Sequence, residues 1–157
     1  MRVTVSVEYA LQALLEIAEN SGNGQRVSAA AIARNQGIPR KFLESILVRL
    51  KRAGFVESVR GPQGGYLLLK KPSEIVVADV IRVIEGPLAA VGDRAPESAR
   101  YKGSAKNLTK LWIATRISLR DLFEEVSLED VSNGNYPRPI ERRLGERESW
   151  RRRNVNK

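Results

Sequence analysis

Residues 39–71 read PRKFLESILVRLKRAGFVESVRGPQGGYLLLKK, and this stretch decides the fold. Apolar residues recur at helical spacing through its first half, which predicts an amphipathic helix over residues 39–53 that begins at Pro39. Two short runs of strand-forming residues follow at 55–60 and 66–70, and the glycine-rich turn 61–65 joins them. The stretch therefore predicts a helix followed by a β-hairpin.

The helix of residues 39–53 is predicted to bury one face and expose the other. Its buried stripe is Phe42, Leu43, Ile46, Leu47 and Leu50, and its outward residues are Arg40, Lys41, Glu44, Ser45, Arg49 and Lys51. Residues 39–71 hold eight lysines or arginines against two glutamates, a net charge of +6. A helix with a packed back and hydrogen-bond donors on its front fits the major groove of DNA, and the charge suits a polyanion.

The residues before and after this stretch complete a winged helix-turn-helix. Residues 5–20 show helical period, and Ser28 and Gly37 are credible ends of a short helix over 29–35. A further helix is expected around 79–85 and ends at a Gly-Pro pair. The predicted fold class is mainly α with a small β-hairpin.

The chain is predicted to have four parts. Residues 1–88 form the DNA-binding domain, residues 89–104 a loop, and residues 105–132 a long helix (105–126) with a short turn after it. Residues 133–157 show no apolar pattern and hold eight basic residues against three acidic ones, which predicts a disordered basic tail.

Contacts with DNA are predicted from the start of the helix at 39–53, from the wing turn and from the cap before residue 29. Glu44 and Ser45 are placed for base edges, and the wing offers Arg60 and Gln63 on a glycine-rich loop that can approach the duplex closely. The full set of predicted DNA-binding residues is Ser28, Pro39, Arg40, Lys41, Glu44, Ser45, Arg49, Arg60, Gln63 and Gly64.

Composition excludes several classes of function. The 157 residues carry a formal net charge of +9 and include no cysteine and no histidine, so disulfides, thiolate or imidazole metal sites and a Ser-His-Asp triad are excluded. We see no catalytic pair and predict that the chain is not an enzyme. No segment approaches the ~20 apolar residues of a membrane span, and the N-terminus lacks the apolar core of a signal peptide. We therefore expect a cytoplasmic, soluble protein with no membrane partner.

The wing carries a specific resemblance. VRGPQGGYLL at 59–68 resembles the wing of the Rrf2 family of bacterial transcription regulators, which includes the IscR-, NsrR- and CymR-like proteins. Further matching stretches are YALQALLEIA at 9–18, FLESILVRL at 42–50, RAGFV at 52–56 and VIRVIEGP at 80–87, so the resemblance covers about residues 1–132.

The resemblance implies a homodimeric repressor or activator that binds a palindromic operator in double-stranded DNA. It places recognition residues at the start of the third helix and on the wing, in agreement with the residues chosen above. It also makes the helix over 105–126 the dimerisation helix, whose predicted pairing residues are Leu108, Leu111, Trp112, Thr115, Leu119 and Leu122. We expect a repressor.

The chain departs from the family pattern in one respect. Many members hold an iron–sulfur cluster through three cysteines in the loop before the dimerisation helix, and the corresponding loop 89–104 has none. We therefore predict no cluster, no metal and no other cofactor. The stretch 111–131 is similar to the cluster-free branch of cysteine-metabolism repressors of the CymR type, which implies control of cysteine or sulfur metabolism through a protein partner such as cysteine synthase.

Three alternatives stay open at the level of sequence. The same fold could serve a non-specific architectural or adaptor protein that binds nucleic acid without reading its sequence. Tyr101, with the cations Arg94, Arg100 and Lys102, could form a small anion site, or the loop could simply be exposed. The tail could be an accessory DNA arm or a solubilising extension.

Overall fold

A computed structural model describes residues 3–21, 24–61 and 63–151. Its helices are α1 (Val5–Ser21), α2 (Ala29–Gln36), α3 (Arg40–Arg52), α4 (Val77–Glu85), α5 (Leu108–Phe123), α6 (Leu128–Asn133) and α7 (Arg138–Leu144). Short 3-10 turns lie at Pro72–Glu74, Pro96–Ser98, Gly103–Ala105 and Arg147–Trp150. Strands β1 (Val56–Val59) and β2 (Gly65–Leu68) form one antiparallel hairpin.

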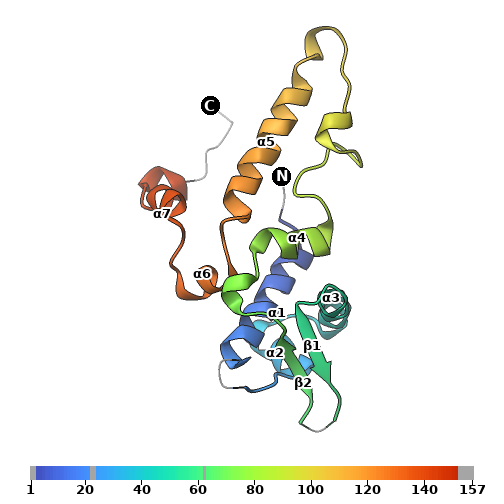
Figure 1. The fold of residues 1–157 in the computed structure, drawn as a ribbon, viewed down its shortest axis with the longest axis vertical. Helices are drawn as coiled ribbons and strands as arrows, with labels where there is room; N and C mark the ends of the chain where they lie inside the picture. The colour runs from blue at the N-terminus through green and yellow to red at the C-terminus, as the bar shows by residue number, and fades with distance from the viewer. Residues whose placement is uncertain (1–2, 22–23, 62, 152–157) are drawn as a thin grey trace.

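Helices α1 to α4 and the hairpin gather at one end of the molecule around a single core, and we call this unit the head (Figure 1). Each helix contributes the residues that its apolar period predicts. Fully buried core residues are Leu14 and Ile17 of α1, Ile32 of α2, Leu43, Leu47 and Leu50 of α3, and Val80 of α4. The core therefore fixes α2 and α3 as a helix-turn-helix on the scaffold of α1 and α4.

The hairpin is attached to the head through strand β2. Val56 pairs with Leu68 and Val59 with Gly65, while Tyr66 exchanges two backbone hydrogen bonds with Val27, of 3.1 and 2.8 Å. A Cβ atom at Gly65 would lie 2.7 Å from the Val27 carbonyl oxygen, so this close approach requires glycine. The two strands and their turn project from the head as a wing.

The loop after α4 leads away from the head, and α5 runs back toward the head alongside this loop (Figure 1). The chain then returns to the head through α6. Val77 donates a backbone hydrogen bond to Val126, and Leu128, which is fully buried, donates one to Ile75; both distances are 2.9 Å. The C-terminal end of α5 is thus anchored to the head, while most of its length is not.

The predicted fold class is confirmed, but two expectations need correction. Phe42 was expected in the buried stripe of α3, yet it is 60% exposed. It lies about 100° around the helix from Leu43 and about 40° from Ile46, which places it at the edge of the buried row. The tail was expected to lack regular structure, yet it contains α7 and the turn Arg147–Trp150; the last tail residues, 152–157, lie outside the described part.

Candidate nucleic-acid interface

The first turns of α3 present charged side chains to solvent. Arg40 and Lys41 are exposed, and the Arg40 Nε donates to the Glu44 Oε1 at 2.9 Å. The side chains of Arg40 and Glu44 are 68% and 52% exposed, so the pair is a weak, easily exchanged interaction. Arg40 and Glu44 can therefore each give up this contact for one with DNA. Among the described residues, Lys41 has no hydrogen-bonding partner that DNA would have to displace.

Ser45 is exposed on the same helix, one turn after Phe42. Its Oγ donates to the Phe42 carbonyl oxygen at 2.8 Å, a contact within the helix itself. With its proton used in this way, Ser45 offers lone pairs and not a donor to a base. Ser45 is exposed, as predicted for an outward residue of this helix, and its DNA contact stays a prediction.

Arg49, a predicted DNA contact, makes hydrogen bonds within the head that the sequence did not predict. Its Nη2 donates to the Val83 carbonyl oxygen at 2.8 Å and also to that of Ile84, both in the last turn of α4. Cations at a helix C-terminus interact favourably with its free carbonyls. Arg49 therefore ties the recognition helix to α4, a contact that sequence spacing could not predict because the partners are 34 and 35 residues apart.

A groove of about 440 Å³ separates α3 from the wing. Its polar lining includes Ser28, Lys51, Ser58 and Arg60, and the Lys51 Nζ donates to the Ser58 Oγ at 2.6 Å. Lys51 lay among the outward residues of the predicted helix but not among the predicted DNA contacts. Cations and hydroxyls on both walls give the groove the chemistry of a phosphate-binding surface.

The wing turn requires glycine for close packing. A Cβ atom at Gly64 would lie 2.3 Å from the Val59 carbonyl oxygen and 2.8 Å from that of Gly61. The turn is therefore narrow, and it carries exposed Arg60 and Gln63 at its tip. Pro62 between them lies outside the described residues. A narrow, cationic turn of this kind can approach a DNA backbone or enter a minor groove.

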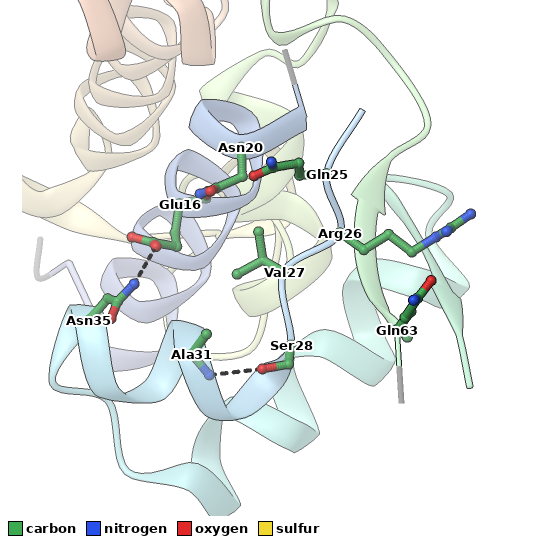
Figure 2. Close-up of a pocket in the computed structure, with 10 residues that line it drawn as sticks. Glu16, Asn20, Gln25, Arg26, Val27, Ser28, Ala31, Asn35 and Gln63 are labelled. Carbon is green, nitrogen blue, oxygen red and sulfur yellow. Dashed lines mark hydrogen bonds between the residues drawn. The ribbon is translucent and has the colours of Figure 1, made fainter. Parts of the chain in front are cut away.

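A second hollow, of about 490 Å³, is lined by α1, α2, residues 25–28 before α2, and Gln63 and Gly64 of the wing turn (Figure 2). Glu16, which is only 8% exposed, accepts from the Asn35 Nδ2 at 2.8 Å and from the Gln36 Nε2 at 2.6 Å. At the other end of α2, the Ser28 Oγ accepts from the Ala31 N–H at 3.1 Å. Ser28 is therefore the N-cap of α2, and these contacts hold the first helix of the helix-turn-helix in place.

Helix α5 exposes apolar residues along its length. None of its 16 residues, all of them described, is buried. Leu111 is 53% and Ile117 is 51% exposed, and Thr115 is exposed as well. The other predicted pairing residues, Leu108, Trp112, Leu119 and Leu122, are half-buried. Helical spacing did not single out Ile117, because it projects from the side of α5 opposite to the predicted pairing face.

The loop before α5 is packed against it. The Trp112 Nε1 donates to the Tyr101 hydroxyl at 3.0 Å, and the Thr109 Oγ1 donates to the Ala99 carbonyl oxygen at 2.7 Å. Arg116 and Glu97 form an ion pair of 2.5 Å. Tyr101 is thus used to hold the loop, and Arg100 donates to the Glu97 carbonyl oxygen of the same loop. These contacts place Tyr101 and Arg100 in the packing of the loop against α5, while Arg94 and Lys102 are exposed.

A packed helix-turn-helix with a cationic recognition helix and a β wing defines a winged-helix DNA-binding protein. The model of the Rrf2 family, described as an iron-dependent transcriptional regulator, matches residues 3–134. The chain belongs to the Rrf2 family of DNA-binding transcription regulators, and it is not an enzyme.

Individual relatives support this assignment. An HTH-type transcriptional regulator of Mycobacterium tuberculosis, named as putative, is 40% identical over 140 residues, which cover 89% of this chain and 86% of the relative. The regulator CymR of Bacillus subtilis is 32% identical over 133 residues, or 85% of this chain and 91% of CymR.

Solved structures agree with the fold. The structure of CymR, the global cysteine regulator of B. subtilis, aligns with a TM-score of 0.72 at 30% identity and covers 86% of this chain and 98% of that one. The T. potens IscR structure aligns with a TM-score of 0.69 at 31% identity, covering 85% and 88%. In the described ranges, no helix is long and apolar enough to cross a membrane.

The family is described as iron-dependent, and iron sites in proteins require particular side chains as ligands. Iron–sulfur clusters are held by thiolates, with imidazole as the known replacement, and this chain has neither cysteine nor histidine. Within residues 3–21, 24–61 and 63–151, no group of three or more acidic side chains is placed to hold a metal ion. The side chains of this chain therefore do not fit an iron–sulfur cluster.

Proposed function

We propose that the protein is a sequence-specific repressor that binds a palindromic operator as a homodimer. The observation that carries this proposal is that one chain exposes two different surfaces. The head exposes Lys41 and Arg60 at the start of α3 and on the wing, and α5 exposes apolar residues that nothing in the described part of the chain covers. The first surface suits DNA, and the second suits another protein chain.

A second copy of this chain is the proposed occupant of the α5 face. Two copies related by a two-fold axis would place like residues of α5 against each other, and such self-complementary interfaces are the commonest in soluble oligomers. The same axis would present two α3 helices to two half-sites of opposite orientation. The operator would then be a palindrome whose half-site spacing is set by the dimer.

The proposed regulator works without an iron–sulfur cluster. The signal would enter through the α5 side of the molecule, where the loop 89–104 packs on Trp112 and Arg116. A partner that binds this side could change the angle between α5 and the head and so the spacing of the two recognition helices. Purified protein with visible absorbance and stoichiometric iron and sulfide would contradict this part of the proposal.

We further propose that the regulated genes serve cysteine or sulfur metabolism. Similarity to the global cysteine regulator of B. subtilis supports this choice, and the absence of cysteine from the chain fits a signal delivered by a protein such as cysteine synthase. Affinity capture from cell extract should recover a cysteine-biosynthesis enzyme. Capture without any such enzyme, together with operators near unrelated genes, would refute this regulon and partner.

Capture of genomic fragments by the purified protein tests the central proposal. Fragments are bound in moderate salt, which suppresses phosphate-only contacts, and are then sequenced. We expect a palindromic motif upstream of a small set of genes, and transcription of those genes should rise when the chain is deleted. Diffuse recovery of fragments without a motif would instead indicate a general nucleic-acid binder.

A further inference from the structure

Phe42 lies exposed at the start of the recognition helix. It is the third residue of α3 and is 60% exposed, whereas the buried row of that helix, Leu43, Ile46, Leu47 and Leu50, is at most 2% exposed. A single exposed apolar side chain is ordinary on a protein surface. Its position is what calls for an explanation, because N-terminal residues of a recognition helix contact base edges.

The chemistry of the neighbouring side chains leaves Phe42 with one kind of contact to make. Arg40 and Glu44 pair with each other, and Ser45 donates its proton to the Phe42 carbonyl oxygen. Phe42 and Ser45 lie three residues apart and so share one side of the helix, next to Lys41. A phenyl ring at this place offers neither a donor nor an acceptor, but only apolar surface.

One base in the major groove presents an apolar group. Thymine carries a C5-methyl group there, and apolar side chains such as phenylalanine read thymine by contact with it. We propose that Phe42 determines specificity for a thymine in each half-site by packing against that methyl group. The inference rests on the proposed function, since it requires that α3 enters the major groove of an operator.

The size of the effect follows from the area of one methyl group. Burial of one methyl group in the complex should raise the affinity about 4-fold, and close packing against a ring raises this factor to roughly 10-fold. A dimer makes the contact twice, so a symmetric change in both half-sites should multiply the effect.

Uracil in place of thymine provides a sharp test, because it removes the methyl group and keeps every hydrogen-bonding atom. Operator duplexes with uracil at each thymine position in turn, changed in both half-sites, are titrated with the full chain by fluorescence anisotropy. We expect one position at which uracil weakens binding about 4- to 10-fold per half-site. Phe42→Ala should weaken binding to the thymine operator by a similar factor. Uracil at that position should then cause no further loss of affinity for the variant.

A matched control lies on the same helix. Val48 is 47% exposed and lines the groove toward the wing, so Val48→Ala should keep the full uracil effect at the Phe42 position. Circular dichroism should show that both variants stay folded, because both side chains are largely exposed.

The outcomes separate this inference from the proposed function. If the protein selects an operator but binds every uracil duplex as tightly as the thymine duplex, the role of Phe42 is refuted and the regulator stands. The same holds if Phe42→Ala keeps the uracil effect, or if Phe42→Ala weakens dimer formation instead, which would make Phe42 a protein contact. If scrambled duplexes bind as well as any selected operator, both proposals fail together.

Discussion

Helices α3 and α5 are both amphipathic, but only α3 buries its apolar side within the chain. Four residues of α3 are at most 2% exposed, whereas α5, which is fully described, has no buried residue. The position of α3 is therefore set by the chain itself, through contacts that are complete in one copy. The apolar residues of α5 are left without a covering element in the described part of one copy, which is why we propose α5 as the place for assembly and regulation.

Removal of a core side chain from α3 should have the largest effect. Leu47 is fully buried, so Leu47→Ala should lower the free energy of unfolding by about 2–5 kcal/mol. Urea unfolding followed by circular dichroism measures this loss. Leu111→Ala on α5 is the counterpart, and in protein dilute enough to be monomeric it should change stability by less than about 0.5 kcal/mol. Equal losses at the two positions would remove the contrast between the helices.

A charge on α5 should separate the copies and leave the head folded. Leu111→Glu would place a carboxylate in the proposed interface and should weaken dimerisation at least about 100-fold, or ~2.7 kcal/mol. Sedimentation velocity measures the dimer, and anisotropy measures the accompanying loss of operator affinity. Lys110→Glu is the control, because residue 110 is exposed and projects about 100° away from Leu111. A Leu111→Glu protein that remains a dimer would show that this face of α5 is not the dimer interface.

Two cations of α3 should behave differently. Arg49→Ala removes the hydrogen bonds to α4 and should cost about 1–3 kcal/mol of stability, with little change in the salt dependence of DNA binding. Lys41→Ala should leave stability unchanged and should reduce the slope of log affinity against log salt by about one for each phosphate that Lys41 neutralises. Thermal unfolding and salt titrations of DNA binding measure both variants. The account would be contradicted if Arg49→Ala lowered the salt dependence and Lys41→Ala lowered the stability.

The contact between Ser127 and Asp130, in the segment that joins the end of α5 to the head, should make a pH-dependent contribution to stability. The Ser127 hydroxyl and then its backbone N–H donate to Asp130 and hold the pKa of that carboxyl below its ordinary value. A lowered pKa stabilises the folded state above the ordinary carboxyl pKa, near pH 4, and this stabilisation is lost as pH falls through the folded-state pKa. Asp130→Asn should therefore be less stable than the wild type at pH 7, by about 1 kcal/mol or less in thermal unfolding, and the gap should close in acid, once the pH lies below the folded-state pKa. A gap that persists in acid would point to packing instead.

The basic tail should give the smallest effect. Helix α7 and the turn after it contact mainly each other, and Trp150 is 75% exposed. Removal of residues 135–157 should keep the operator sequence preference and flatten the salt dependence by one or two charges, if the arginines reach flanking DNA. An unchanged slope would make the segment a solubilising extension.

The head could be predicted from sequence because its helices keep one apolar face at regular spacing. Leu43, Ile46, Leu47 and Leu50 are buried as predicted, and Ser28 caps α2 as predicted. Phe42 was misplaced because helical period marks the centre of a buried stripe better than its edges. The edge is decided by how far neighbouring elements reach, which is a tertiary property.

Other features depend on residues that are distant in sequence. Arg49 carries a charge that suits phosphate, and only the fold reveals that the last turn of α4 is its partner. Helix α7 has seven residues and almost no apolar stripe, so periodicity gives no signal for it. The pairing of α5 with a second copy, the DNA contacts of individual residues and the four-part division of the chain stay predictions.

The number of chains in the free protein and on its operator decides whether α5 pairs two copies for DNA binding. Native mass spectrometry of the full chain, alone and mixed with a selected operator duplex, counts the copies in each species. We expect two chains in the free protein at micromolar concentration and two chains on one duplex. A single chain in both states, bound to the duplex with undiminished specificity, would show that the proposed dimer is wrong.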